Sequence, residues 1–184
     1  MSRVAVLADR VVSRSLVMDG ILITGSIALM AVLAQISIPL WPVPVTLSTL
    51  AVMLIAATLG TARGTVSIVG YLSAGALGLP VFAGAASLSA VRPTFGYLVG
   101  FVLAAVLIGY FVSRGFDKSF LKMAGVFTLA SVVIYATGAA WLVTGFGMDI
   151  QQAIAVGVLP FLIGDALKVV LASSLIAGAR KILN

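Results

Sequence analysis

The chain has 184 residues, of which 62% are hydrophobic and 9% are charged, and its mean hydropathy is +1.26. Soluble domains carry roughly 25% charged residues, so this composition excludes an ordinary soluble domain and indicates an integral membrane protein. The net charge of +6 is spread along the chain and does not form one basic patch, so it does not indicate nucleic-acid binding. We expect one integral membrane domain over residues 1–184. Residues 1–16 are expected to form a cytoplasmic N-terminal flank that is not removed as a signal peptide. The helices are expected within 17–178, followed by a short cytoplasmic C-terminal segment at 179–184.

Six apolar stretches are candidates for membrane-spanning helices, which need about 20 mostly apolar residues each. Prolines 39, 42 and 44 forbid regular helix between the first two, whereas only "GTARG" separates the second from the third. In a later connection, Asp149 is expected to cap a short interfacial helix. The fold predicted is an all-α membrane bundle with spans at Val17–Ile38, Thr46–Leu59, Gly64–Leu77, Phe95–Val112, Met123–Val143 and Leu159–Gly178.

The basic residues predict the orientation of these helices, because cytoplasmic loops carry an excess of lysine and arginine. With six spans, both termini are cytoplasmic and most of the cations fall on that side: Arg3, Arg10, Arg14, Arg63, Arg114, Lys118, Lys122, Arg180 and Lys181. Arg92 and Lys168 fall toward the outer side instead. Because these two cations depart from the rule, they are candidates for a functional role.

Lys168 has an acidic neighbour, Asp165, at a spacing of three residues, which puts both on one helix face. They lie about 13 and 9 Å along the helix from Leu159, too deep for easy escape to the outer interface. Ionisable residues at such depth face protein or water and are functional candidates. The alternative is a neutralised pair that only fastens the bundle, although desolvation makes such a pair an inefficient source of stability.

Arg92 follows a glycine-rich outer loop and precedes Pro93, which holds the preceding residue extended. Such a loop can fold into protein and present an arginine to a cavity; the alternative is an anchor to lipid headgroups. One carboxylate and two cations suit a small ligand with amide-like donors and an anionic end.

Aromatic residues cluster around the predicted outer loops. Singly, each is better explained by packing or an interfacial belt, but together they can wall an apolar pocket. Tyr71 and Tyr110 are expected to lie elsewhere, as packing residues. The candidate wall residues are Trp41, Phe82, Phe95, Tyr97 and Phe161.

The absence of certain residues restricts the chemistry. The chain has no histidine, cysteine or glutamate, which removes the usual metal ligands, most general bases and thiol nucleophiles. No hydrolase elbow or ATP-binding P-loop motif is present. We therefore expect no catalytic residues, no metal, no cofactor and no nucleotide site. If the protein drives uphill transport, the energy must then enter through another chain or an ion gradient.

Four stretches taken together, "IPLWPVPVTLSTLAV", "GALGLPVFAG", "RPTFGYLVGF" and "GVLPFLIGDALKVVLA", resemble the BioY family, the biotin-binding S components of energy-coupling-factor transporters. The resemblance runs from about Ile38 to the end of the last helix. It implies a six-helix S-component fold with the vitamin held near the outer surface. It also implies a transmembrane T component and two cytoplasmic ATPases as partners.

Carried over by position, Asp165 and Lys168 match the family's ligand-contacting G-D-x-x-K pair, and Arg92 matches the arginine of R-P-T-F-G. Many relatives have glutamine where this chain has Ser48, and many have glycine at position 92. The family's first helix meets the T component through an A-x-x-x-A-like face, and Gly20, Thr24 and Ala28 resemble it loosely through small-xxx-small spacing, which also serves packing within a bundle.

The resemblance therefore implies a membrane subunit that captures biotin from outside, with Asp165, Lys168 and Arg92 as ligand-binding residues. From their place near the outer loops, the aromatic residues Trp41, Phe82, Tyr97 and Phe161 are expected to complete the ligand-binding site. The ureido group would donate to Asp165, and either cation would meet the carboxylate. The alternatives are a subunit for another vitamin, a membrane enzyme that uses Asp165 and Lys168 as acid and base, and a scaffold with a structural ion pair.

Overall fold

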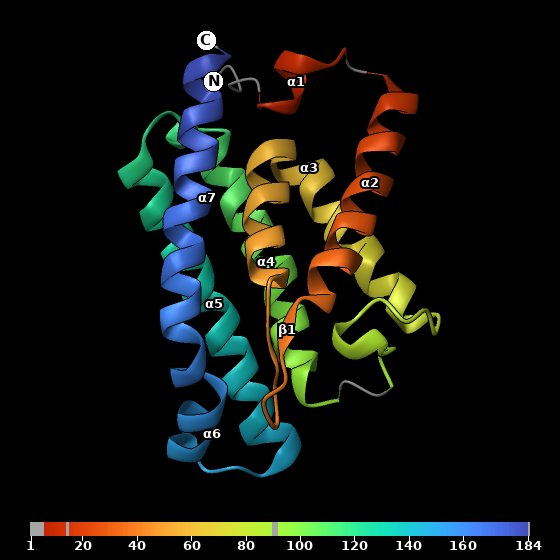
Figure 1. The fold of residues 1–184 in the computed structure, drawn as a ribbon, viewed down its shortest axis with the longest axis vertical. Helices are drawn as coiled ribbons and strands as arrows, with labels where there is room; N and C mark the ends of the chain where they lie inside the picture. Colours follow the sequence, from red (N-terminus) through yellow and green to blue (C-terminus); the bar gives the residue numbers. More distant parts are fainter. Residues whose placement is uncertain (1–5, 14, 90–91, 184) are drawn as a thin grey trace.

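A computed structural model describes residues 6–13, 15–89 and 92–183, with the side chain of Arg92 outside the description. The chain forms an elongated helical bundle (Figure 1). Its helices are α1 (Ala8–Val11), α2 (Leu16–Gln35), α3 (Ser48–Ala76), α4 (Phe95–Val112), α5 (Phe120–Phe146), α6 (Ile150–Gly157) and α7 (Leu162–Ile182). Two short strands, β1 (Ser37–Ile38) and β2 (Val45–Thr46), and the 3₁₀ turns η1 (Ala83–Ala85), η2 (Arg92–Thr94), η3 (Phe116–Lys118) and η4 (Leu159–Phe161) connect them.

Helix α3 consists of two membrane-spanning halves, because the chain reverses its direction at Gly60. This residue has φ +78° and ψ −173°, a backbone conformation that favours glycine. The two halves run in opposite directions (Figure 1). A Cβ on Gly64 would lie 3.0 Å from the Cα of Ala56, so glycine lets the halves approach closely. Among the described residues, five helices are long and apolar enough to cross a membrane, and the break in α3 divides one of them to give the six predicted segments.

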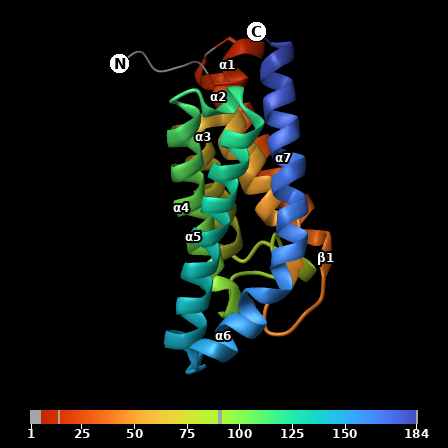
Figure 2. The same cartoon turned by 90° about the vertical axis from the view of Figure 1, so that its left-hand side faces the viewer.

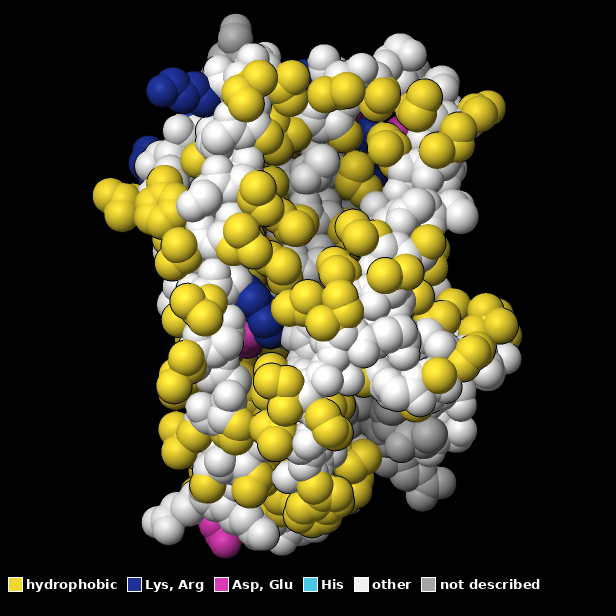
Figure 3. Space-filling model, viewed as in Figure 1, with side chains coloured by type: hydrophobic (Ala, Val, Ile, Leu, Met, Phe, Trp, Pro, Cys, Tyr) yellow, Lys and Arg dark blue, Asp and Glu magenta, His cyan; other side chains and the backbone are white. Residues whose placement is uncertain are grey.

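The prediction of an all-α membrane bundle is confirmed. The predicted span Phe95–Val112 coincides with α4, and Asp149 caps α6 by accepting a hydrogen bond from the backbone N–H of Gln152 at 2.8 Å. The three-proline segment forms no helix and instead joins β1 to β2, which pair antiparallel with Ser37 opposite Thr46. Apolar side chains cover much of the lateral face in Figure 3.

One end of the bundle carries α1, η3 and the end of α7, and the other carries the β1–β2 hairpin, η1 and α6 (Figures 1 and 2). At the first end, Arg63 pairs with Asp9 and with Asp19, and Arg10 donates to the carbonyl of Leu183 at 3.0 Å. These contacts fasten α1 to the bundle. The predicted grouping of cations at this end therefore includes internal ion pairs.

Helix α2 is the least covered of the long helices, because only Met30 and Ala34 among its residues are buried. It packs mainly against α3, and its last turn contacts η1. Figure 1 shows it at the edge of the bundle. Its small residues Gly20, Thr24 and Ala28 are exposed, so among the described residues they do not serve packing within the bundle.

Candidate ligand-binding site

A pocket opens among α3, α4, α5 and α7, toward the end that carries the β1–β2 hairpin. About 610 Å³ of empty space lies among its lining residues, open solvent at its mouth included. Its walls are mostly apolar, with a few polar groups. The lining residues are Val43, Pro44, Thr46, Ser48, Thr49, Tyr71, Phe82, Ala83, Thr94, Tyr97, Leu98, Phe101, Ile134, Tyr135, Phe161, Asp165 and Lys168.

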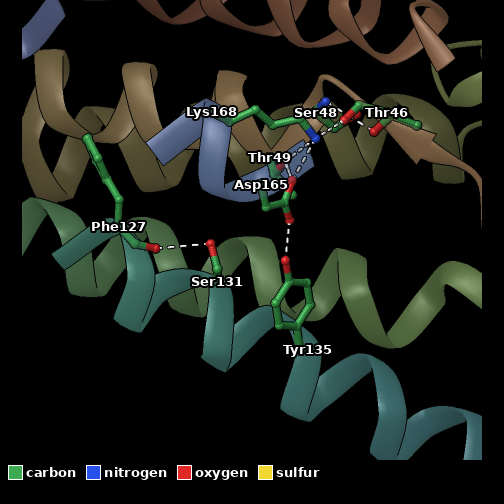
Figure 4. A network of polar contacts seen from close by, with 8 residues as sticks. All are labelled: Thr46, Ser48, Thr49, Phe127, Ser131, Tyr135, Asp165 and Lys168. Carbon is green, nitrogen blue, oxygen red and sulfur yellow. Dashed lines mark hydrogen bonds and ion pairs between the residues drawn. The ribbon is translucent and has the colours of Figure 1, made fainter. Parts of the chain in front are cut away.

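Asp165 is the acidic centre of the pocket. It lies in the first turn of α7 and is 2% exposed. Its Oδ1 accepts hydrogen bonds from Lys168 Nζ at 2.7 Å and Thr49 Oγ1 at 3.0 Å, and its Oδ2 accepts one from the hydroxyl of Tyr135 at 2.6 Å (Figure 4). Three donors from three helices thus hold one carboxylate, which offsets much of the cost of burying its charge.

Lys168 is fully bonded in this arrangement. Besides Asp165, its Nζ donates to the backbone carbonyl of Thr46 at 2.6 Å and to Thr49 Oγ1 at 3.0 Å. An ammonium group has three protons, so all of them have acceptors within the protein. The lysine therefore joins the end of β2 to α3 and α7, and it has no proton left for a further anion.

The carboxylate of Asp165 keeps part of its hydrogen-bonding capacity. A carboxylate offers about four acceptor positions, two on each oxygen, and the Oδ1 of Asp165 already has two donors. The Oδ2 has one, Tyr135. With the donors that the described residues supply, the carboxylate can thus accept one more hydrogen bond, from an N–H or O–H of a ligand, at Oδ2.

Aromatic rings form the apolar walls. Phe82 is 3% exposed and packs edge-on against Tyr71, with ring centroids 5.1 Å apart. Phe161 lies 6.0 Å from Tyr97 and 6.3 Å from Tyr135 by the same measure. The polar cluster therefore lies beside apolar rings, an arrangement that suits a ligand with a polar head and an apolar body.

Tyr97 contributes its ring to the pocket, but its hydroxyl serves the scaffold. The hydroxyl donates to the carbonyl of Gly157 at 2.7 Å, and a Cβ on Gly138 would lie 2.3 Å from the ring. Glycine at position 138 thus makes room for the ring, and the hydrogen bond fixes the end of α6 beside α4.

A wider, mostly apolar groove lies between α5, α6 and α7, and Asp165 and Tyr135 line it as well as the pocket. Asp165 is nevertheless almost wholly buried. Its carboxylate therefore lies in the wall between the pocket and the groove, with its described hydrogen-bond partners supplied by protein groups.

The structure brings together five of the seven residues expected to bind ligand: Asp165, Lys168, Phe82, Tyr97 and Phe161 all line the pocket. Trp41 does not line it and is 81% exposed. The side chain of Arg92 lies outside the described residues, although Thr94, two positions later, is on the pocket wall. Phe95, a further candidate wall residue, packs instead against Trp141 at 5.2 Å.

Sequence reasoning missed Thr49, Tyr71 and Tyr135. The expectation that Tyr71 lies elsewhere is wrong, since it lines the pocket. Thr49 and Tyr135 are polar residues within otherwise apolar helices, where a buried hydroxyl needs a partner. That signal points to a polar cluster but does not say which helices bring its members together.

Residues 6–184 match the sequence model of the BioY family. A relative from Thermotoga maritima named biotin transporter BioY is 40% identical over 158 residues, covering 84% of this chain and 91% of the relative. A relative of the same name from Rhizobium etli is 35% identical over 172 residues, covering 89% and 91%. The fold is similar to a crystal structure of the S-component for biotin from an ECF-type ABC transporter, with a TM-score of 0.78 and 25% identity over 92% of this chain and 95% of that one.

Proposed function

Because the chain belongs to the BioY family, we propose that it is the substrate-binding membrane subunit of a transporter and that it captures biotin from outside for uptake. One observation carries the proposal. A buried carboxylate with a single acceptor position left lies in the wall of an apolar pocket, within a bundle built to cross a membrane.

The chemistry of biotin fits this pocket. Its ureido ring offers N–H donors, its thiophane ring is apolar, and its valerate chain ends in an anion. We expect one ureido N–H to donate to Asp165 Oδ2, and the rings of Phe82, Tyr97 and Phe161 to enclose the apolar part.

We expect the carboxylate of biotin to bind away from Lys168, because all three protons of the Lys168 ammonium group already have acceptors. Arg92 is the remaining cation near the pocket in sequence, two residues before the lining residue Thr94. An arginine binds a carboxylate through two parallel hydrogen bonds. Arg92 is therefore our candidate for the anionic end.

Partner chains are part of the proposal. The chain has no P-loop sequence, so we expect a transmembrane T component and two cytoplasmic ATPases to supply the energy. The exposed small residues of α2 would let a partner helix approach closely. We place the cation-rich end, with both termini, in the cytoplasm.

The same residues suit a protein that binds biotin without converting it to a product. Asp165 and Lys168 bond to each other and to hydroxyl and carbonyl groups, which suits recognition of a neutral donor. We expect biotin to be recovered chemically unchanged after it has bound.

Calorimetric titration of the purified protein in detergent tests the proposal. Biotin should bind tightly, desthiobiotin should bind through the same ureido ring, and thiamine and riboflavin should not bind. Tight binding of another vitamin with none of biotin would reassign the substrate, and conversion of bound biotin to a product would replace a carrier by an enzyme.

A further inference from the structure

Gln35, the last residue of α2, connects that helix to the loop that bears Phe82. Its Nε2 donates toward the carbonyls of Val81 at 3.3 Å and Phe82 at 3.1 Å, and toward that of Ala31 within its own helix at 3.0 Å. Its Oε1 accepts from the backbone N–H of Ala85 at 2.9 Å. One amide thus binds three residues of the loop through both its donor and its acceptor.

The loop is compact around this amide. Phe82 and Ala86 exchange two backbone hydrogen bonds, of 3.0 and 3.2 Å, which close a narrow turn over η1. The Gln35 amide contacts the backbone of this turn, and the turn carries Phe82, which lines the pocket. The position of the ring therefore depends on the turn that Gln35 holds.

Helix α3 holds the same ring from another side. A Cβ on Gly75 would lie 2.2 Å from the Phe82 ring, so the ring occupies a slot that only glycine leaves open. The hydroxyl of Tyr71 donates to the carbonyl of Val81 at 3.2 Å. Phe82 is thus fixed between α3, which is well buried, and α2, which is not.

We propose that Gln35 is a positioning residue that couples α2 to the binding pocket: it holds the Phe82 ring over bound ligand, and displacement of α2 frees the ring. The inference rests on the proposed function, because the pocket is taken as the biotin site. A partner seated on the exposed face of α2 would then act on ligand release through one side chain. Glutamine suits the role because an amide is both donor and acceptor.

The first experiment measures the rate at which labelled biotin dissociates from wild type, Gln35→Met and Gln35→Glu in detergent. Gln35→Met keeps the size of the side chain and removes its hydrogen bonds, and we expect dissociation about tenfold faster, equivalent to the net loss of one or two hydrogen bonds. Gln35→Glu places a carboxylate against three carbonyls, so its rate should be higher still. Val32→Ala, an exposed change one turn earlier on α2, is the matched control and should leave the rate unchanged.

A double-variant cycle separates positioning from general loosening. If Gln35 acts through Phe82, Gln35→Met should change the dissociation rate less than about twofold in a Phe82→Ala background. Multiplicative effects of the two changes would overturn the inference, as would equal rates in wild type and Gln35→Met.

A measurement made without ligand tests the inference separately from the proposed function. The chain has no cysteine, so Ala85→Cys provides a single site for a nitroxide label on the exposed turn. Without biotin, the label should be more mobile in the Gln35→Met variant of this labelled protein than in the labelled protein that keeps Gln35. Unchanged mobility would overturn the inference, whereas failure of the wild type to bind biotin would overturn the proposed function alone.

Discussion

Two buried ion pairs lie at different levels of this bundle, and their surroundings differ more than their burial. Asp165 and Lys168 are 2% and 7% exposed, and Asp117 and Arg180 are 0% and 1% exposed. The first pair has an N–O distance of 2.7 Å and shares Thr49, Tyr135 and the Thr46 carbonyl as partners. The second has a distance of 3.3 Å and joins η3 to the last turn of α7.

The comparison shows that burial of charge does not by itself identify a binding site. Asp117 and Arg180 are the more deeply buried, yet they do not line the pocket that holds Asp165 and Lys168. What distinguishes the first pair is the pocket beside it, which both Asp165 and Lys168 line. We therefore propose that the first pair recognises ligand, whereas the second connects η3 to the end of α7.

Removing the cation of each pair should produce the largest effects. Lys168→Met and Arg180→Met each leave a buried carboxylate without its counter-ion, which costs about 3–5 kcal/mol of stability. Unfolding of both variants by SDS titration should show losses of this size.

Biotin binding should separate these two variants. Measured on the folded fraction, Lys168→Met should lose binding, because Asp165 is no longer held toward the pocket, whereas Arg180→Met should keep the affinity of wild type. Equal losses of affinity in both variants would remove the distinction between the two pairs.

Tyr135→Phe should have an intermediate effect. The change removes the hydroxyl that fixes Asp165 Oδ2 but keeps the ring against Phe161. Since hydrogen bonds to charged groups contribute about 1.5–3 kcal/mol and only part of this acts on the ligand, biotin should bind roughly tenfold more weakly by calorimetry. Tyr97→Phe is the matched control, because its hydroxyl bonds to Gly157; a larger loss there would mean that Tyr97 contacts the ligand directly.

The smallest effect concerns the pH dependence of stability. Burial raises the pKa of Asp117, against the opposing charge of Arg180. The folded state then binds more protons than the unfolded state between the ordinary aspartate pKa, about 3.9, and the raised value, so this group's contribution to stability falls as the pH rises through that window. Asp117→Asn should remove that fall in thermal unfolding in detergent; a slope unchanged from wild type would contradict the assignment.

Much of the fold follows from the sequence, because apolar runs and prolines act locally. The span Phe95–Val112 and the cap at Asp149 are found where the pattern puts them. The second and third predicted spans are joined in α3, and this depends on the backbone conformation of a single residue, Gly60. The ion pair between Asp117 and Arg180 was not predictable, since the two residues are far apart in the chain and each reads as part of a cytoplasmic flank.

The site was predictable in its charged part and less so in its neutral part. Asp165 and Lys168 stand out because ionisable residues are rare in apolar helices. Thr49, Tyr71 and Tyr135 do not stand out, because hydroxyl residues are common in such helices and only the packing of the helices brings the three to one pocket. Conversely, Trp41 lies in the connection between β1 and β2, where it is exposed and does not line the pocket.

The most direct test is a side-by-side calorimetric titration of Asp165→Asn and Asp117→Asn with biotin. Both changes replace a buried carboxylate by an amide of the same shape, so any difference between them reports on the pocket. We expect Asp165→Asn to bind biotin at least roughly a hundredfold more weakly than wild type, and Asp117→Asn to bind it as wild type does. Unchanged affinity in Asp165→Asn would contradict the assignment of ligand recognition to that carboxylate.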